Sequence, residues 1–255
     1  MKSLKLFLFV VCAAALFISC KSAKSLQNEL RFLRFDLDYE LTSNIHSGER
    51  NKTLYLNEID NSNMEYFTSV PKAGSLVLPF ILLNYWQKKY TVVLGEASLT
   101  QAYCEFLSDA LLAECNRSAA FNLKLNSMSI VPGDTYLLDM KIVHNETKSG
   151  IKASKTVLFI PPLMDGFDFN MGSYRVLPTE SNLEVAVCLT KGNQVLFEKQ
   201  YRAKDHLDGK NTVFDTSPDV NEACVIRMID CLSVVTRNIV TSITNDLNVI
   251  LSVKQ

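Results

Sequence analysis

The stretch LEVAVCLTKGNQVLFEKQY, residues 183–201, decides the fold of this chain. Large apolar residues stand at every second position from Leu183 to Leu189, and a second alternating run leads from Val195 to Tyr201. Gly192 and Asn193 stand between the two runs, and two residues of this kind between alternating runs predict a β-hairpin. Alternation places the apolar side chains on one face of the hairpin, so other elements have to cover that face.

Two amphipathic helices are predicted to provide this cover. A capping box at Ser98 and apolar residues at every third or fourth position predict a helix over residues 98–116. Ser217 and Pro218 are suited to start a second and longer helix, because serine is a common cap and proline is tolerated in the first turn. The apolar positions of this last helix recur as far as Leu247.

Further strands are predicted from alternating or apolar runs at residues 30–41, 53–58, 90–94, 121–130 and 136–144. The short strand at 53–58 is expected to pair back on 30–41 as a hairpin, and the polar residues 145–150 are expected to close the strand at 136–144. Residues 204–216 are polar and predict a loop. The chain is therefore expected to be α+β, a mostly antiparallel sheet with two amphipathic helices on one face, preceded by N-terminal strands.

The first twenty residues have the layout of a secretory signal. Lys2 and Lys5 precede an apolar run over residues 6–17, which is well short of the roughly 20 residues that cross a bilayer. Because Ser19 stands directly before Cys20, the segment resembles a bacterial lipoprotein signal, in which the cysteine sulfur is acylated and the leader is removed in front of it. Phe17 stands where such signals usually have leucine, and ordinary cleaved secretion is the alternative.

This resemblance implies a lipid anchor on Cys20, with palmitate among its acyl chains, in the cell envelope of a bacterium. Two or three acyl chains hold a protein firmly at a membrane. The residues after Cys20 lack the aspartate of an inner-membrane retention signal, which favours the outer membrane, periplasmic side. We expect a signal peptide over 1–19, the lipidated cysteine and linker over 20–28, an N-terminal β extension over 29–86 and an α+β domain over 87–255.

Composition excludes several classes of partner. The chain has 26 Lys and Arg against 27 Asp and Glu, and no basic stripe in the sequence indicates nucleic acid. Five cysteines follow Cys20, and their spacing within the predicted helices is too long for a disulfide inside either helix. They are expected to be small buried side chains, with a bridge between helices left open. There is no C-x-x-C motif or cysteine-histidine cluster, so no metal and no cofactor are expected.

Two apolar stretches, residues 76–86 and 157–169, have no place in a simple alternating sheet, because each contains proline. The first stretch is either a buried or edge strand or a surface that faces a membrane or partner. In the second stretch, either a strand ends at Pro161-Pro162 and the rest is a long excursion, or the segment contacts a partner or lipid. On the second reading, the partner-binding residues are Leu76, Trp86, Phe159 and Phe167. A third reading places the aromatic side chains of these stretches around a lipid or glycan, which would make the protein a lipid- or glycan-binding module.

The sequence offers little evidence for an enzyme. None of the common local motifs for nucleophilic, zinc or nucleotide chemistry occurs, and the three histidines are scattered in the sequence. A hydrolase that uses His144 or His206 is the less favoured alternative, because distant residues can meet in a fold. We expect a protein without catalytic activity.

The order of elements resembles that of periplasmic lipoproteins with a compact domain of one sheet and two helices. These include the ABC-type transport auxiliary, curli-secretion and peptidoglycan-synthase-activator lipoproteins. Four segments carry the resemblance, namely 98–121, 134–143, the 183–201 hairpin and the last helix. The resemblance implies a protein that acts by contact, as an accessory or scaffold component of an envelope transport or assembly complex, with an envelope protein as its partner.

Overall fold

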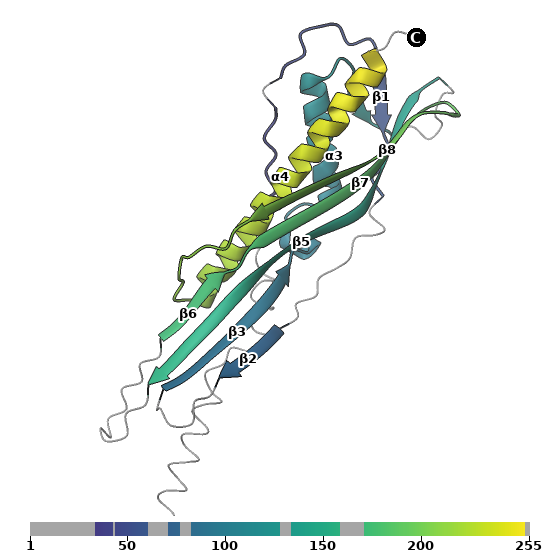
Figure 1. Ribbon diagram of the computed structural model, residues 1–255. Helices are drawn as coiled ribbons and strands as arrows, with labels where there is room; N and C mark the ends of the chain where they lie inside the picture. The colour runs from purple at the N-terminus through teal and green to yellow at the C-terminus, as the bar shows by residue number, and fades with distance from the viewer. Residues whose placement is uncertain are drawn as a thin grey trace, which may run out of the picture.

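The computed structural model describes residues 34–42, 44–60, 71–76, 83–127, 134–158 and 171–252. These residues form one eight-stranded sheet and two α-helices, so the predicted α+β class is confirmed (Figure 1). The sheet runs in the order β2-β3-β5-β1-β4, while β6 and β7 also pair with β5, and β8 pairs with β7. The strands are β1 (Thr53–Leu56), β2 (Pro71–Leu76), β3 (Leu83–Val93), β4 (Asn122–Leu125), β5 (Tyr136–Leu158), β6 (Met171–Val176), β7 (Thr179–Lys191) and β8 (Gln194–Leu207).

The predicted hairpin is present as β7 and β8, which pair antiparallel along almost their whole length. Gly192 at its turn has φ of 56°, a left-handed conformation that glycine adopts without steric cost. In β7 every second residue from Thr179 to Leu189 is buried. The alternation therefore gives β7 one face toward the core and one outer face, as the sequence predicts.

β5 is much longer than its sequence pattern suggests, because the turn predicted at residues 145–150 is wrong. The strand passes a register shift between Ile142 and His144 and then continues to Leu158. Its buried hydroxyl groups at Thr147 and Ser149 are hydrogen-bonded to hydroxyl groups of β7. Polar residues that read as a turn in the sequence are thus satisfied inside a continuous sheet.

The sheet is mixed and not mostly antiparallel, which corrects the prediction. β1 runs parallel to both of its neighbours, β4 and β5, and so does not form the expected hairpin with residues 30–41. Leu54 and Leu56 of β1 are buried in the core. Residues 34–42 and 44–52 cross the helices before β1 begins, so the chain enters the sheet as a central strand and cannot fold back directly on its predecessor.

The two helices are α3 (Tyr103–Ser118) and α4 (Ser217–Ser252). α4 starts at the predicted serine, whereas α3 starts later than predicted, because Glu96–Ser98 form a short 3-10 helix and the expected capping box is not made. α4 packs on β5, β6, β7 and β8, and α3 packs on α4 and β4 (Figure 1). Among the described residues, neither helix combines the length and the apolar character needed to cross a membrane.

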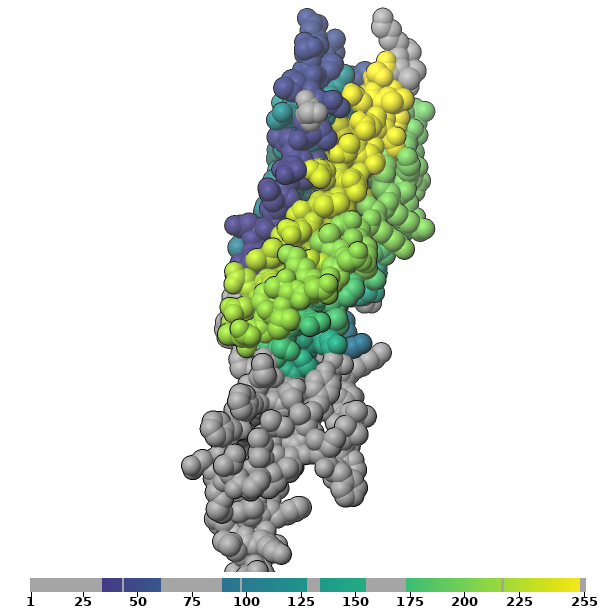
Figure 2. Space-filling model, turned by 60° about the vertical axis from the view of Figure 1, so that its left-hand side comes forward, coloured from purple at the N-terminus to yellow at the C-terminus, as the bar shows by residue number. Residues whose placement is uncertain are grey.

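Residues 34–42 and 44–52 lie over the helices, and we call these two segments the strap (Figure 2). Phe35 bridges to Leu99, and the Lys52 ammonium group donates to the carbonyl of Leu251 at the C-terminal end of α4, 2.6 Å away. The strap and β1 therefore belong to the same packed body as the sheet. The boundary expected between residues 86 and 87 falls inside β3.

Part of the sheet extends beyond the helices. β2, β3, residues 149–158 of β5, and β6 form a four-stranded unit that runs past the end of α4 at Ser217, and we call this unit the ribbon (Figure 1). Its strands are antiparallel to one another, with β3 paired to β5 from Leu83 opposite Leu158 to Val93 opposite Lys148. The molecule thus consists of a helix-covered body and a projecting ribbon.

Candidate functional site on the outer face of the sheet

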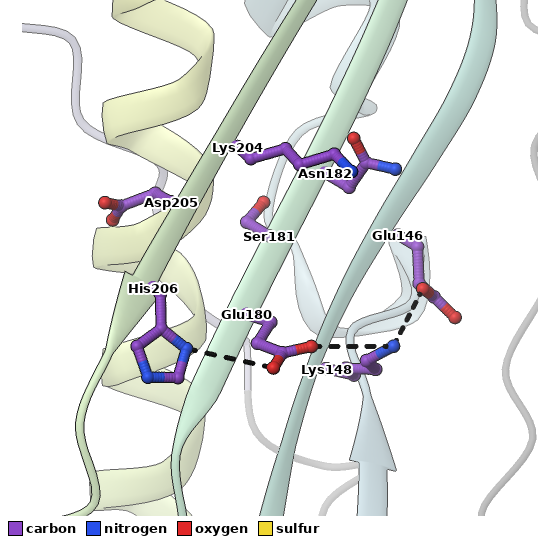
Figure 3. Close-up of a pocket in the computed structure, with 8 residues that line it drawn as sticks. All are labelled: Glu146, Lys148, Glu180, Ser181, Asn182, Lys204, Asp205 and His206. Carbon is purple, nitrogen blue, oxygen red and sulfur yellow. Dashed lines mark hydrogen bonds and ion pairs between the residues drawn. The ribbon is translucent and has the colours of Figure 1, made fainter.

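The face of the sheet that the helices leave open carries a shallow depression of about 380 Å³ (Figure 3). Strands β5, β7 and β8 position its residues, because successive residues of neighbouring strands lie side by side across the ladder. The lining consists almost entirely of charged and amide side chains. It comprises Glu146, Lys148, Glu180, Ser181, Asn182, Lys204, Asp205 and His206.

Close contacts between charged and ionisable side chains cross the depression in a chain. The Lys148 ammonium group lies 3.3 Å from Glu146 and 3.7 Å from Glu180. The Nδ1 atom of His206 is 3.8 Å from Glu180, and its Nε2 atom is 3.3 Å from Asp208. All of these side chains are about half exposed or more, so each pair contributes at most about 1 kcal/mol to stability.

Ser181 and Asp205 contribute to the lining only from the edge, because alternation turns their side chains to the core. Ser181 is buried and hydrogen-bonded to Thr147 at 2.7 Å. Asp205 accepts a hydrogen bond from the thiol of Cys231 at 3.3 Å, and burial followed by this carboxylate raises the pKa of Cys231 to about 12. The Ser181 hydroxyl therefore lies on the opposite face of the sheet from His206 and is not placed to lose its proton to this imidazole.

The other candidate base, His144, is exposed at the irregularity of β5 and lies opposite Glu184. Glu184 already accepts from Arg202 at 2.9 Å. Within the described residues, no group of His, Cys, Asp and Glu is arranged to hold a metal ion. The solvated side chains of the outer face can bind polar or charged ligands. This face is therefore suited to contact another molecule.

The residues predicted to bind a partner lie in or next to the ribbon. Leu76 is the last residue of β2 and lies opposite Tyr85, while Trp86 of β3 lies opposite Ser75. The backbone thus brings Leu76 and Trp86 to neighbouring strands near the far end of the ribbon. Cys20, Phe159 and Phe167 lie outside the described residues.

All five cysteines that follow Cys20 are free thiols. Cys115, Cys224 and Cys231 are buried, and Cys104 and Cys188 are partly buried. Burial raises the pKa of Cys115 to about 12 and that of Cys224 to about 11. The prediction that these residues act as small buried side chains is confirmed for the three on the core side.

Comparisons with known proteins add only distant likeness to solved structures. No protein-family model and no curated protein matches the chain. A crystal structure of a Xanthomonas campestris protein described as DUF330 aligns with 84% of this chain and 97% of its own, at 12% identity and a TM-score of 0.40. A likeness at this level carries no argument about the fold or the function of this chain.

Apart from His206, the outer-face residues around Lys148 and Glu180 were not among the sequence candidates. In the sequence they stand within a predicted turn, a strand flank and a predicted loop, and the loop expected from residue 204 begins only after Leu207. Only the pairing of β5, β7 and β8 brings them together. A usable signal in the sequence was the polar residue at every second position from Glu198 to His206.

Proposed function

We propose that this chain is a lipoprotein held at the periplasmic side of the outer membrane by an acylated Cys20. In this proposal it serves as an accessory or scaffold component of an envelope transport or assembly complex and has no catalytic activity. The observation that best supports the proposal is the ribbon, which projects beyond the helix-covered body and carries Leu76 and Trp86 near its far end (Figure 1). A projecting set of strands is suited to contact another protein.

The segment between the proposed anchor and the folded body is short enough to keep the body near the membrane. The stretch from Cys20 to Arg34 spans at most about 50 Å when fully extended. The strap that follows is fixed to the body, since Phe35 is hydrogen-bonded through its backbone to both Ser98 and Thr100. The body is thereby kept within a short distance of the membrane, while the ribbon remains available to a partner in the same compartment.

We propose that the partner is a membrane-embedded or periplasmic protein of the envelope. The residues of this chain proposed to contact it are Leu76, Trp86, Phe159 and Phe167. Support comes from the register of β2 and β3 and from the apolar composition of residues 76–86 and 157–169. The outer-face depression supports a contact role as well, because its charges are paired with one another and solvated.

The anchor is tested by replacing Cys20 with serine. Labelled palmitate should be incorporated by the natural chain and not by Cys20→Ser, and the natural chain should sediment with outer membranes after fractionation. Cys12→Ser is the matched control and should change neither result, because this cysteine lies inside the leader. Equal palmitate labelling of the two variants would contradict the anchor.

The contact role is tested by site-specific photocrosslinking in cells. A crosslinker at position 86 in the ribbon should give a discrete adduct with one envelope protein. A crosslinker at Lys124, which is exposed on β4 of the body, should give none of this adduct. If both positions give the same pattern of adducts, the ribbon is not the specific contact surface.

A further inference from the structure

The ribbon carries a row of directly opposed cations across its four strands. Lys89 of β3 lies opposite Lys152 of β5, and Lys152 lies opposite Arg175 of β6. On the other side of β3, Lys72 of β2 occupies the register position opposite Lys89. Neighbouring strands are about 4.8 Å apart, so the backbone positions of the four cationic residues fall within about 15 Å.

The described cations of this row point away from the helices. Lys89 and Arg175 are exposed and Lys152 is half-buried, whereas the adjacent residues Ile151 and Val176 are buried in the core. Because successive residues of a strand face opposite sides, the row belongs to the open face of the sheet. It is therefore accessible from the side opposite α4.

The cation row differs from the body in its lack of carboxylate partners among the described residues. Among the described residues, no carboxylate lies within ion-pair distance of Lys89, Lys152 or Arg175. In the body, by contrast, Lys148 is flanked by two carboxylates. Like charges directly opposite one another destabilise a sheet, so the row has a cost in the isolated protein that an external anion would remove.

The charge of the ribbon is one-sided as a whole. Its strands contain six Lys and Arg, one in β2, two in β3, two in residues 149–158 of β5 and one in β6, and they contain no Asp or Glu. Since the net charge of the full chain is −1, all residues outside the ribbon together carry −7. A nearly neutral chain thus has a strongly cationic end.

We propose that the outer face of the ribbon binds the phosphate groups of an anionic lipid surface. Charge complementarity favours an occupant with several anionic groups in one plane, since the cationic positions are spread over four strands of a sheet rather than gathered around one pocket. A bilayer that contains anionic lipid offers such a plane. An acidic protein segment would offer a line of charge along one strand, whereas this row runs across the strands.

The place of the strap supports a membrane over a soluble polyanion. β3 ends at Val93, and the strap begins beside the residues that follow it, where Phe35 pairs with Ser98 and Thr100. The chain between Cys20 and Arg34 reaches about 50 Å at most, so an acyl anchor would keep the ribbon close to a lipid surface. Only this part of the argument rests on the proposed anchor, and the cation row is independent of it.

The test is flotation of the full chain with vesicles, using the Cys20→Ser chain so that no acyl group contributes. Vesicles of phosphatidylcholine alone are compared with vesicles that contain 30% phosphatidylglycerol. The readout is the ratio of the two partition coefficients. The apolar leader is the same in all variants, so its contribution to vesicle binding does not change between them. The ribbon variant combines Lys89→Gln, Lys152→Gln and Arg175→Gln.

The matched control combines Lys124→Gln, Lys141→Gln and Lys210→Gln, which removes the same charge from exposed positions of the body. We expect the ribbon variant to lose about a hundredfold in preference for anionic vesicles, as estimated from the attraction per basic residue at such a surface. The control should lose at most a few-fold. The preference of the unsubstituted chain should also fall steeply in 0.5 M salt, because exposed charges are then screened.

Several outcomes would overturn the proposal. Equal losses in the ribbon variant and the control would show that net charge and not the row is responsible. Strong binding of polyglutamate without a preference for anionic vesicles would identify an acidic polypeptide as the occupant. Competition by millimolar inorganic phosphate would identify a site for a free anion. Failure of palmitate labelling at Cys20 would remove the anchor but leave the flotation result unchanged, so the two proposals fail separately.

Discussion

The carboxylate of Glu114 should determine whether the strap stays on the body. Glu114 belongs to α3 and is 1% exposed, yet it is ionisable. The Tyr39 hydroxyl donates to it at 3.1 Å, the backbone N–H of Thr42 donates at 3.1 Å, and the Thr42 hydroxyl also donates. Three donors from the strap therefore converge on one buried carboxylate.

Glu114→Gln keeps the shape of this side chain but removes its charge and one acceptor oxygen. A hydrogen bond to a charged group contributes about 1.5–3 kcal/mol, and a buried donor left without an acceptor costs about 1–3 kcal/mol. The amide retains one acceptor and turns its NH₂ group toward a remaining donor. We expect the free energy of unfolding to fall by about 3 kcal/mol in a urea titration at neutral pH.

The Glu114 carboxylate should also make the stability of the protein depend on pH. Burial by itself would raise the pKa of Glu114, but the hydrogen bonds from Thr42 and Tyr39 outweigh it and hold the pKa below its ordinary value of 4.5. The stabilisation is therefore complete above pH 4.5 and is lost as the pH falls through the lower native pKa. In Glu114→Gln this part of the acid-side slope should be absent.

The control is Glu105→Gln, which makes the same chemical change at an exposed position of the same helix. Its stability should stay within about 0.5 kcal/mol of the natural protein. Amide hydrogen exchange of residues 34–42 should accelerate in Glu114→Gln and not in the control. If the two variants have equal stability and equal exchange in the strap, the reasoning about Glu114 is refuted.

Three further perturbations have defined outcomes. Tyr103→Phe removes a buried hydroxyl that is 2.8 Å from that of Thr236, and because Thr236 retains a backbone acceptor, urea titration should show a loss of about 1 kcal/mol. Asp246→Asn removes the carboxylate that accepts a hydrogen bond from the Tyr201 hydroxyl at 2.7 Å. The free energy of unfolding should fall by about 1 kcal/mol above pH 3.8, the ordinary pKa of aspartate, and should not differ in strong acid, where both side chains are neutral. The Cys115 thiol, whose pKa burial raises to about 12, should react with a thiol reagent only after denaturation. Prompt reaction in the native state would contradict its burial.

The elements that could be predicted from the sequence are those in which one local rule sufficed. The β7–β8 hairpin follows from alternation around Gly192, and α4 follows from a continuous apolar stripe that begins at Ser217. The pairing of β1 was not predictable in this way. Its four residues specify a strand, but their parallel neighbours are chosen by the path of the strap across the helices.

The prediction from the sequence was wrong where polar side chains are buried and hydrogen-bonded to one another. Thr147 and Ser149 read as a turn because Ser and Thr are common there, yet their hydroxyls pair with Ser181 and Thr179 across the ladder. The buried Glu114 gave no signal either, because its donors come from residues 72 and more positions away in the sequence. Interactions between distant polar residues are invisible to periodicity.

The cation row on the ribbon could not be predicted from the sequence either. Lys89, Lys152 and Arg175 are ordinary charged residues in the sequence, and nothing in their local context distinguishes them from Lys124. Their importance depends on register, and a shift of one residue between β3 and β5 would place Lys89 opposite a neighbour of Lys152 on the other face. A surface built from register can be proposed only once strand pairing is established.

The hydroxyl pairs of β5 and β7 mark the place where the ribbon begins. Up to Ile142 the core side of β5 is apolar and packs under the helices, Thr147 and Ser149 then place two hydroxyl groups on it, and Ile151 continues it with a buried apolar side chain. Each hydroxyl has a cross-strand partner, so the change costs little, but it adds little apolar burial that would hold a helix. Beyond this point Ile151 and Val176 are still buried, while the strands that continue past them are held by backbone pairing. On the open face the surroundings of the lysines change over the same length, from Lys148 with two carboxylates beside it to Lys152 in the cation row, so the ribbon can gain stability from an anionic surface that it binds.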